Sequence, residues 1–300
     1  MINMKVLSIT EPFASLIKEG KKRVETRSFK TNYRGYLYIH ASLTKKNIFN
    51  SQDLLNLLEN TEFKYGYIIC KCKLVDCIYM TKEFVSDMME NHYQEYICGE
   101  YKEGRYAWIL DDIEEVKPIK AKGQLGIWNY YSEEEILSLM DNIEYGYVDN
   151  KGNTYTDDYQ NFSSLYVLSS PDEVIKNRVG VCFDQVELER YYFKNAGFDV
   201  KTYFIVHDVG IKDSHTFLTY TNNGKYYWFE HAFADYRGIH EYNSLKDLLC
   251  DVSEKFINDI ENPILDKIKI YCYPKPTYHM SVLEFFNYLE KQDLIKIDKL

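Results

Sequence analysis

Residues 177–197 read NRVGVCFDQVELERYYFKNAG, a stretch that predicts one long helix with a cysteine at its start. Apolar side chains recur at helical spacing from Cys182 to Ala196, and Gly197 is a typical cap for the end of a helix. The free N–H groups of a first helical turn stabilise an anion, so a thiolate at Cys182 would be favoured. A buried thiol fits the same stretch equally well, and the rest of the chain has to decide between the two interpretations.

A β-hairpin is predicted at residues 215–233, which read HTFLTYTNNGKYYWFEHAF. Two runs of alternating residues flank Asn223-Gly224, and Asn-Gly is the strongest short signal for a hairpin turn. With these two as the turn residues, His215 on the first strand and Glu230 on the second lie on one face, one diagonal step apart. A carboxylate at that separation is close enough to orient an imidazole ring.

A cysteine at a helix start, a histidine on one strand and a carboxylate on the next follow the order of transglutaminase-like and papain-like enzymes. The C-terminal half resembles the transglutaminase-like superfamily in GVCFDQVELE, SHTFLTY and YYWFEHA. The resemblance implies a transglutaminase-like, papain-like α+β domain with a catalytic triad of Cys182, His215 and Glu230. The superfamily usually has Asp at the third position, and Asp235 is the reserve candidate for it.

These residue types predict attack of a thiolate on an amide carbonyl. His215 would take the thiol proton, Glu230 would hold the ring in one tautomer, and Cys182 would form a thioester. The oxyanion would meet the backbone N–H of Cys182 and a second donor, for which Gln160 and Asn161 are candidates. Water is abundant and no amine site is evident. We therefore expect a cysteine peptidase or deamidase that hydrolyses a protein or peptide substrate, rather than a cross-linking enzyme.

The N-terminal half carries a second resemblance. Residues 8–42, SITEPFASLIKEGKKRVETRSFKTNYRGYLYIHAS, resemble the start of ASCH domains, a branch of the PUA-like β-barrels. GYIICKCKLVDC (66–77), YAWIL (106–110) and KPIKAKGQLGIWNY (117–130) follow in the order that such a domain shows. The resemblance covers nearly all of residues 4–130. It implies a small mixed β-barrel that binds nucleic acid, with RNA or a modified nucleotide as the partner.

The basic residues of this half suggest where a nucleic acid would bind. Lys21, Lys22, Glu25 and Arg27 follow Gly20 on a turn and a short strand, with Glu25 and Arg27 on one face. Cations beside a carboxylate can bind a phosphate and the edge of a base. An internal salt-bridge network that braces the barrel is the alternative, and the residues themselves leave both interpretations open.

Two further functions stay open as alternatives. Some ASCH proteins are amidohydrolases that act on an acetylated cytidine through a lysine after this glycine and a threonine three residues later. Lys22 matches the lysine, but Glu25 occupies the threonine position. We therefore expect binding in this domain rather than nucleoside amide hydrolysis. In the other alternative, the whole chain is a non-catalytic adaptor associated with RNA.

Length and charge favour two domains with different tasks. The chain has 300 residues and a net charge of −10. Its first 131 residues carry 19 Lys and Arg against 17 Asp and Glu, whereas the remaining residues carry 17 against 29. Ser132 and Glu135 form a capping-box pattern that starts a new helix. We place the domains at residues 1–131 and 132–300. The second domain is too acidic to attract a polyanion.

Location and cofactors follow from what the sequence lacks. It has no apolar run of about 20 residues and no signal-peptide pattern, which predicts a cytoplasmic protein without a membrane partner. Its seven cysteines have no regular spacing, so we expect reduced thiols rather than a disulfide framework. Cys70, Cys72 and Cys77 lie close together but lack a zinc-knuckle pattern. We therefore expect neither a metal nor another cofactor.

Overall fold

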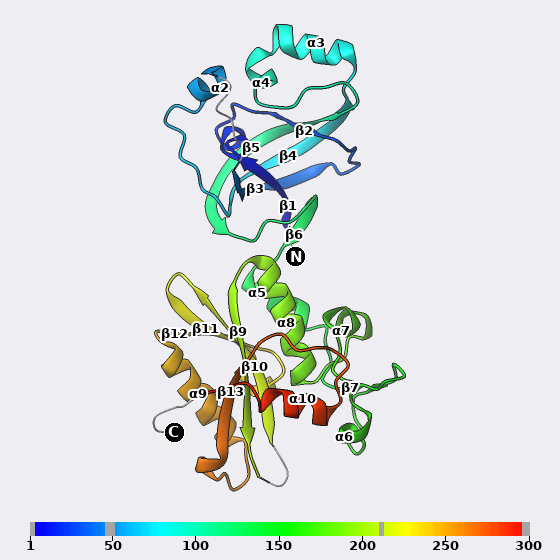
Figure 1. Ribbon diagram of the computed structural model, residues 1–300, viewed down its shortest axis with the longest axis vertical. Coiled ribbons are helices and arrows are strands. Elements are labelled where there is room, and N and C mark those ends of the chain that lie inside the picture. The colour runs from blue at the N-terminus through cyan, green and yellow to red at the C-terminus, as the bar shows by residue number, and fades with distance from the viewer. Residues whose placement is uncertain (1–3, 46–51, 210–212, 296–300) are drawn as a thin grey trace. The chain divides into compact units, whose positions relative to one another are not determined.

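The computed structural model describes residues 4–45, 52–209 and 213–295 (Figure 1). The chain divides into two compact units, residues 1–130 and 131–300. Each unit combines helices with a six-stranded sheet, so the fold class is mixed α+β. In the described residues, no helix is long and apolar enough to cross a membrane.

The N-terminal unit is built on one sheet with the strand order β2-β5-β4-β3-β1-β6. Strands β1 and β3 are parallel, and the other neighbouring pairs are antiparallel. The strands are β1 (Met4–Glu11), β2 (Val24–Arg27), β3 (Gly35–Lys45), β4 (Tyr67–Tyr79), β5 (Tyr106–Lys120) and β6 (Ile127–Tyr130). The helices are α1 (Phe13–Lys18), α2 (Gln52–Leu57), α3 (Lys82–Asn91) and α4 (Tyr93–Tyr96).

This sheet differs from the predicted barrel in length and closure. Strand β5 runs for 15 residues, where the sequence predicted a strand only over residues 105–110 and a bent one later. Three register shifts between β4 and β5 mark bulges, which bend the pair. Strands β2 and β6 lie at opposite ends of the sheet and do not pair with each other in the described residues, so the predicted barrel is open there.

The core of the N-terminal unit lies between α1 and one face of the sheet, where Ile17, Leu37 and Leu110 are buried together. Cys70 and Cys72 point into the same core, as the alternation in β4 predicts. Burial raises the pKa of both thiols. Among the described residues, no group of three or more His, Cys, Asp and Glu side chains could hold a metal ion.

The C-terminal unit has an antiparallel sheet with the order β12-β11-β10-β9-β13-β14 and a separate pair of short strands, β7 and β8. The strands are β7 (Tyr147–Val148), β8 (Thr154–Tyr155), β9 (Asp199–His207), β10 (Ser214–Asn222), β11 (Lys225–Glu230), β12 (Gly238–Tyr242), β13 (Ile268–Tyr273) and β14 (Asp293–Ile295). The helices are α5 (Glu133–Met140), α6 (Phe162–Leu165), α7 (Pro171–Asn177), α8 (Cys182–Ala196), α9 (Leu245–Asn258) and α10 (Val282–Leu289). The sequence patterns did not predict β12, β13 or β14.

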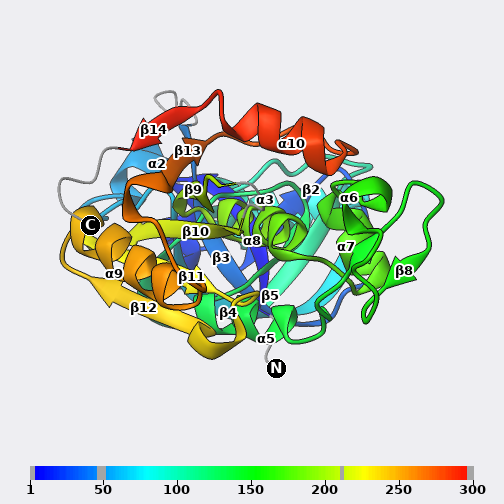
Figure 2. The ribbon, with the colours of Figure 1, turned by 90° about the horizontal axis from the view of Figure 1, so that it is seen from below.

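Two helices cover opposite faces of this sheet (Figure 1, Figure 2). Helix α8 packs against the face that carries Phe204 and Leu218. Helix α9 packs against the other face, which carries Tyr203 and Phe217. Both faces are therefore buried, and polar side chains at the strand ends are enclosed together with them.

The local predictions for this unit are confirmed. Helix α8 spans Cys182–Ala196, as predicted, and the capping box before α5 forms. In the hairpin, Asn222 pairs with Lys225, which is the predicted register. Asn223 and Gly224 have φ angles of 49° and 78°, the left-handed backbone that a two-residue hairpin turn requires.

Candidate functional site

Helix α8 begins at Cys182 because a buried carboxylate holds the chain just before it. Asp184 accepts the backbone N–H of Val181 at 3.0 Å. It also accepts the N–H of Ser169 at 2.8 Å and the hydroxyl of Tyr166 at 3.0 Å. Burial raises the pKa of Asp184 to about 7, although these hydrogen bonds act in the opposite direction. The contacts fix the first turn, where the N–H of Cys182 has no partner within the helix.

Gln185 connects the start of α8 to the end of β11. Its Nε2 donates to the carbonyl oxygen of Gly180 at 2.7 Å. Its Oε1 lies 2.7 Å from Nδ1 of His231, the residue that follows Glu230 in the chain. Both Gln185 and His231 are buried. This bridge holds the helix start beside the strand end that carries the predicted carboxylate.

His215 and Glu230 lie together on adjacent strands, as the hairpin register predicts. Nε2 of His215 is 2.8 Å from Oε2 of Glu230. The same carboxylate accepts Nε1–H of Trp228 at 3.1 Å and the backbone N–H of Phe233 at 2.8 Å. His215 is 7% exposed and Glu230 is 2% exposed. Three donors therefore fix the carboxylate, which in turn fixes the imidazole ring.

The thiol of Cys182 lies beside the imidazole of His215, close enough to contribute to the pKa of the ring. Burial lowers the pKa of His215, but the charge of Glu230 and the bonds to Cys182 and Glu230 outweigh it and raise the pKa to about 10. The ring is therefore protonated at neutral pH and stabilises an adjacent thiolate. Cys182, His215 and Glu230 are called the Cys182 cluster below.

Glu189 is a buried acid near the Cys182 cluster that the sequence did not single out. It lies two helical turns after Cys182, on the same side of α8, and is 3% exposed. Burial, followed by the charge of Glu230, raises the pKa of Glu189 well above its usual value.

The structure brings a different side chain to Cys182 from those that the sequence suggested. Asp235, the reserve carboxylate, is exposed in a short 3-10 turn, and Gln160 and Asn161 are exposed near α6. The hydroxyl of Tyr145 instead lies beside both the side chain and the backbone of Cys182. No local pattern marks Tyr145, because its place depends on a contact with the chain before α8.

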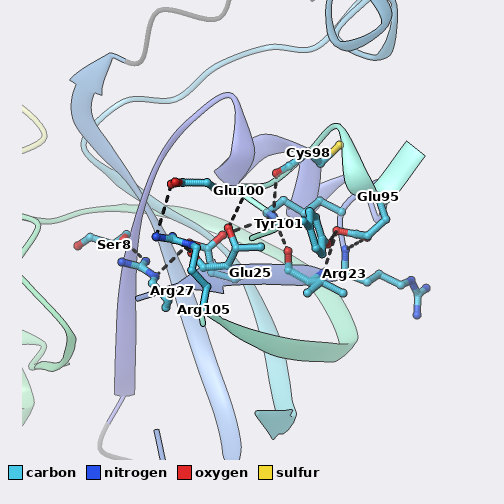
Figure 3. A network of polar contacts seen from close by, with 12 residues as sticks. Ser8, Arg23, Glu25, Arg27, Glu95, Cys98, Glu100, Tyr101 and Arg105 are labelled. Atoms are coloured by element: carbon cyan, nitrogen blue, oxygen red, sulfur yellow. Dashed lines mark hydrogen bonds and ion pairs between the residues drawn. The ribbon is translucent and has the colours of Figure 1, made fainter. Parts of the chain in front are cut away.

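The predicted nucleic-acid residues of the N-terminal unit are only partly at the surface. Figure 3 shows Glu25 and Arg27 within a network of polar contacts. Lys22 is 1% exposed, and its ammonium donates to the carbonyl oxygens of Val24 and Cys98. Its Nζ also lies 3.5 Å from Oε2 of Glu25. Lys22 is therefore an interior lysine, enclosed by oxygen atoms of the protein itself.

The other members of this group connect Lys22 to the surface. Oε1 of Glu25 lies 3.0 Å from Nε of Arg27, whose side chain is 23% exposed. Arg27 also donates to the carbonyl oxygen of Ser8 at 3.0 Å. Lys22, Glu25 and Arg27, called the Lys22 cluster below, form the internal network that was the alternative interpretation. Lys21 lies outside it and is half-buried, with its Nζ 2.7 Å from a carboxylate oxygen of Glu19.

A shallow depression of about 280 Å³ lies beside this network. It is lined by Lys21, Arg23, His92 and Tyr93, among others. The Arg23 side chain is 60% exposed. The Tyr93 ring stacks on that of Tyr96, with centroids 6.5 Å apart and planes inclined by 24°. Cations beside a stacked, exposed aromatic ring are the combination that contacts the phosphates and bases of single-stranded nucleic acid.

Comparison with known families identifies one part of the chain. Residues 7–120 match the ASCH domain, a PUA-like RNA-binding fold, and the N-terminal sheet is consistent with it. The match includes the Lys22 cluster and the depression, and it ends before the Cys182 cluster. No curated protein matches the chain.

Proposed function

We propose that this chain, with an ASCH domain at residues 7–120, couples an RNA-binding unit to a thiol-dependent amide hydrolase. One observation carries the hydrolase: an imidazole that is hydrogen-bonded to a carboxylate lies beside a cysteine at a helix start. The C-terminal unit would belong with transglutaminase-like and papain-like enzymes. Its helix begins at Cys182, while His215 and Glu230 lie on neighbouring antiparallel strands of the sheet that α8 covers.

The proposed reaction proceeds in two steps. The Cys182 thiolate attacks the amide carbon and forms a C–S bond, while the carbonyl π electrons move to oxygen. When the intermediate collapses, the C–N bond breaks, and His215 gives its proton to the leaving amine. In the second step His215 takes a proton from water, and the hydroxide attacks the thioester carbon. The C–S bond then breaks, which releases the acid and restores the Cys182 thiolate. Glu230 balances the charge on the imidazolium throughout.

The proposed substrate is an amide of a protein or peptide, and the activity is that of a cysteine peptidase or deamidase. All seven cysteines of the chain are unpaired, which supports action in a reducing compartment such as the cytoplasm. No cofactor is needed for this chemistry, because the nucleophile, the base and the orienting carboxylate are side chains of this unit.

Alkylation of the native protein with iodoacetamide at neutral pH tests the proposed nucleophile, with each cysteine quantified by mass spectrometry. We expect Cys182 to react faster in the native chain than in the unfolded chain, and much more slowly after His215→Asn. Cys250, which is partly buried, provides an internal control whose reaction rate should not change with His215→Asn. Equal rates for Cys182 in the native and unfolded chains would contradict an activated thiolate and leave a non-catalytic, RNA-associated adaptor.

The second proposed activity is RNA binding by the ASCH domain, which the family match and the depression lined by Arg23 and Tyr93 support. The burial of Lys22 among backbone carbonyls does not favour a nucleoside amidohydrolase that acts through that lysine. We expect Arg23→Ala to weaken the binding of a single-stranded RNA and to reduce the slope of log K against log salt by about 0.7. Lys73→Ala, a basic residue outside the depression, is the matched control. A slope that does not depend on Arg23 would remove it from the interface.

A further inference from the structure

Tyr145 is held beside Cys182 by backbone contacts between two distant segments. The N–H of Glu144 donates to the carbonyl oxygen of Arg178 at 2.9 Å, and the N–H of Gly180 donates to the carbonyl oxygen of Glu144 at 3.1 Å. This short parallel bridge fixes the residue before Tyr145 against the chain that leads into α8. These backbone contacts therefore place Tyr145 beside Cys182.

Gly146, the next residue in the chain, also restrains the position of Tyr145. A Cβ at Gly146 would lie 2.4 Å from the backbone oxygen of Tyr155, a distance that real Cβ atoms do not show. On the other side, the hydroxyl of Tyr159 donates to the carbonyl oxygen of Tyr145 at 3.2 Å. The backbone of Tyr145 is thus restrained from both sides, whereas its side chain is half-exposed.

The hydroxyl of Tyr145 lies beside two groups of Cys182, its backbone N–H and its sulfur. A phenol can accept a hydrogen bond from the first group and donate one to the second. The negative charge of a Cys182 thiolate, followed by burial, raises the pKa of Tyr145. The phenol is therefore protonated at neutral pH and remains a hydrogen-bond donor.

The oxyanion of the proposed reaction forms at the same place. When sulfur bonds to a carbonyl carbon, the carbonyl oxygen becomes negative and approaches the backbone N–H of the nucleophile. In the structure the phenol oxygen of Tyr145 lies beside that N–H. A carbonyl oxygen that arrives there displaces the phenol oxygen by a small movement and meets its O–H proton.

We propose that Tyr145 is a catalytic residue that donates the second hydrogen bond to the oxyanion, beside the backbone N–H of Cys182. The inference rests on the proposed thiol hydrolase and assigns the donor that the sequence had sought at Gln160 or Asn161. No covalent change occurs at Tyr145, since the phenol keeps its proton and only exchanges its acceptor from sulfur to the carbonyl oxygen.

Two reagents that modify the same thiol by different routes test this role. Iodoacetamide alkylates sulfur by displacing iodide and forms no oxyanion, whereas p-nitrophenyl acetate acylates sulfur through a tetrahedral oxyanion and releases p-nitrophenolate. In Tyr145→Phe we expect acetylation of Cys182 to slow by about 10²-fold, the usual loss of one oxyanion donor, with alkylation within about twofold of the unsubstituted chain. Tyr227→Phe removes a hydroxyl elsewhere in the same unit, which bonds to Glu241, and should leave both rates unchanged.

The possible outcomes separate this inference from the proposed function. Equal acetylation rates in Tyr145→Phe and the unsubstituted chain would overturn the role of Tyr145 while leaving the hydrolase intact. Faster alkylation in Tyr145→Phe, without slower acetylation, would show that the hydroxyl only shields the thiol from the reagent. This result would also overturn the catalytic role of Tyr145. If Cys182 of the unsubstituted chain were not acetylated at all, the hydrolase and the inference would both fall. Thermal unfolding of each variant checks that the fold is retained.

Discussion

The Lys22 cluster of the N-terminal unit and the Cys182 cluster of the C-terminal unit both contain buried charged side chains, and the two clusters end differently. In the Lys22 cluster, the ammonium is enclosed by Glu25 and by two backbone carbonyls that have no chemistry of their own. In the Cys182 cluster, a carboxylate and an imidazole lead to a thiol at the start of a helix. Both clusters contain a cation with a carboxylate beside it, so charge and burial alone do not distinguish them.

The difference shows what separates a structural ion network from a candidate active site. A buried charge is costly unless it is paired and hydrogen-bonded, and both clusters meet this requirement. In the Lys22 cluster the ammonium is surrounded by the two carbonyl oxygens and Glu25, so the contacts leave no reactive group at the end of the network. In the Cys182 cluster they fix the imidazole and leave sulfur, a nucleophile, as the last atom of the chain of contacts. Reactivity is therefore indicated by a nucleophilic atom at the end of the network, rather than by the charge of the network.

The largest expected effect is on acylation and comes from the carboxylate of the Cys182 cluster. Glu230→Gln keeps the shape of the side chain but removes the charge that holds the imidazolium, so acetylation of Cys182 by p-nitrophenyl acetate should fall by about 10²–10⁴-fold. Glu25→Gln makes the equivalent change in the Lys22 cluster and should leave the acetylation rate unchanged. Full activity in Glu230→Gln would contradict the role assigned to the carboxylate.

An effect of intermediate size is expected on stability and comes from the Lys22 cluster. Lys22→Met leaves the buried carbonyls of Val24 and Cys98 without this donor, and it leaves Glu25 without one of its two cations. We expect the free energy of unfolding of the ASCH domain to fall by about 3 kcal/mol, measured by urea denaturation. Lys21→Met, whose partner Glu19 is nearer the surface, should cost about 0.5 kcal/mol. Equal losses in the two variants would mean that Lys22 is not enclosed as described.

A dependence of stability on pH is also expected, and it comes from the Cys182 cluster. The pKa of His215 is raised from the ordinary 6.5 to about 10 in the folded chain, so the folded state holds this proton more tightly than the unfolded state. Its contribution to stability is fully present below about pH 6.5 and is lost as the pH rises to about 10. The stability difference between the unsubstituted chain and His215→Gln should therefore shrink over this interval. A difference that grows with pH would show that the imidazole is buried in its neutral form.

The Cys182 cluster could largely be predicted because its parts are marked by local signals. The Asn-Gly turn sets the register of the hairpin, and that register puts His215 and Glu230 on one face. Helical spacing and a capping glycine mark both ends of α8. The roles of Tyr145 and Glu189 could not be predicted in this way, because no spacing rule relates either residue to the hairpin strands.

The arrangement of the Lys22 cluster, in contrast, could not be predicted from the sequence. The basic residues after α1 indicate a polyanion partner as readily as an internal network, and sequence alone leaves this choice open. Burial decides it for Lys22, through a contact with the carbonyl of Cys98 far along the chain. The surface cations are instead half-buried Lys21 and exposed Arg23, beside the stacked rings of Tyr93 and Tyr96.

The sequence by itself determined the helices, the hairpin, its register and the ASCH resemblance, since periodicity, turn residues and caps act between neighbours in the chain. Only the tertiary structure decided that Lys22 is interior, that the thiol of Cys182 meets the imidazole of His215, and that the hydroxyl of Tyr145 meets Cys182. The physical reason is that burial and side-chain contact depend on how distant segments pack. Cys182 was already a candidate nucleophile from the sequence, and packing places His215 beside it.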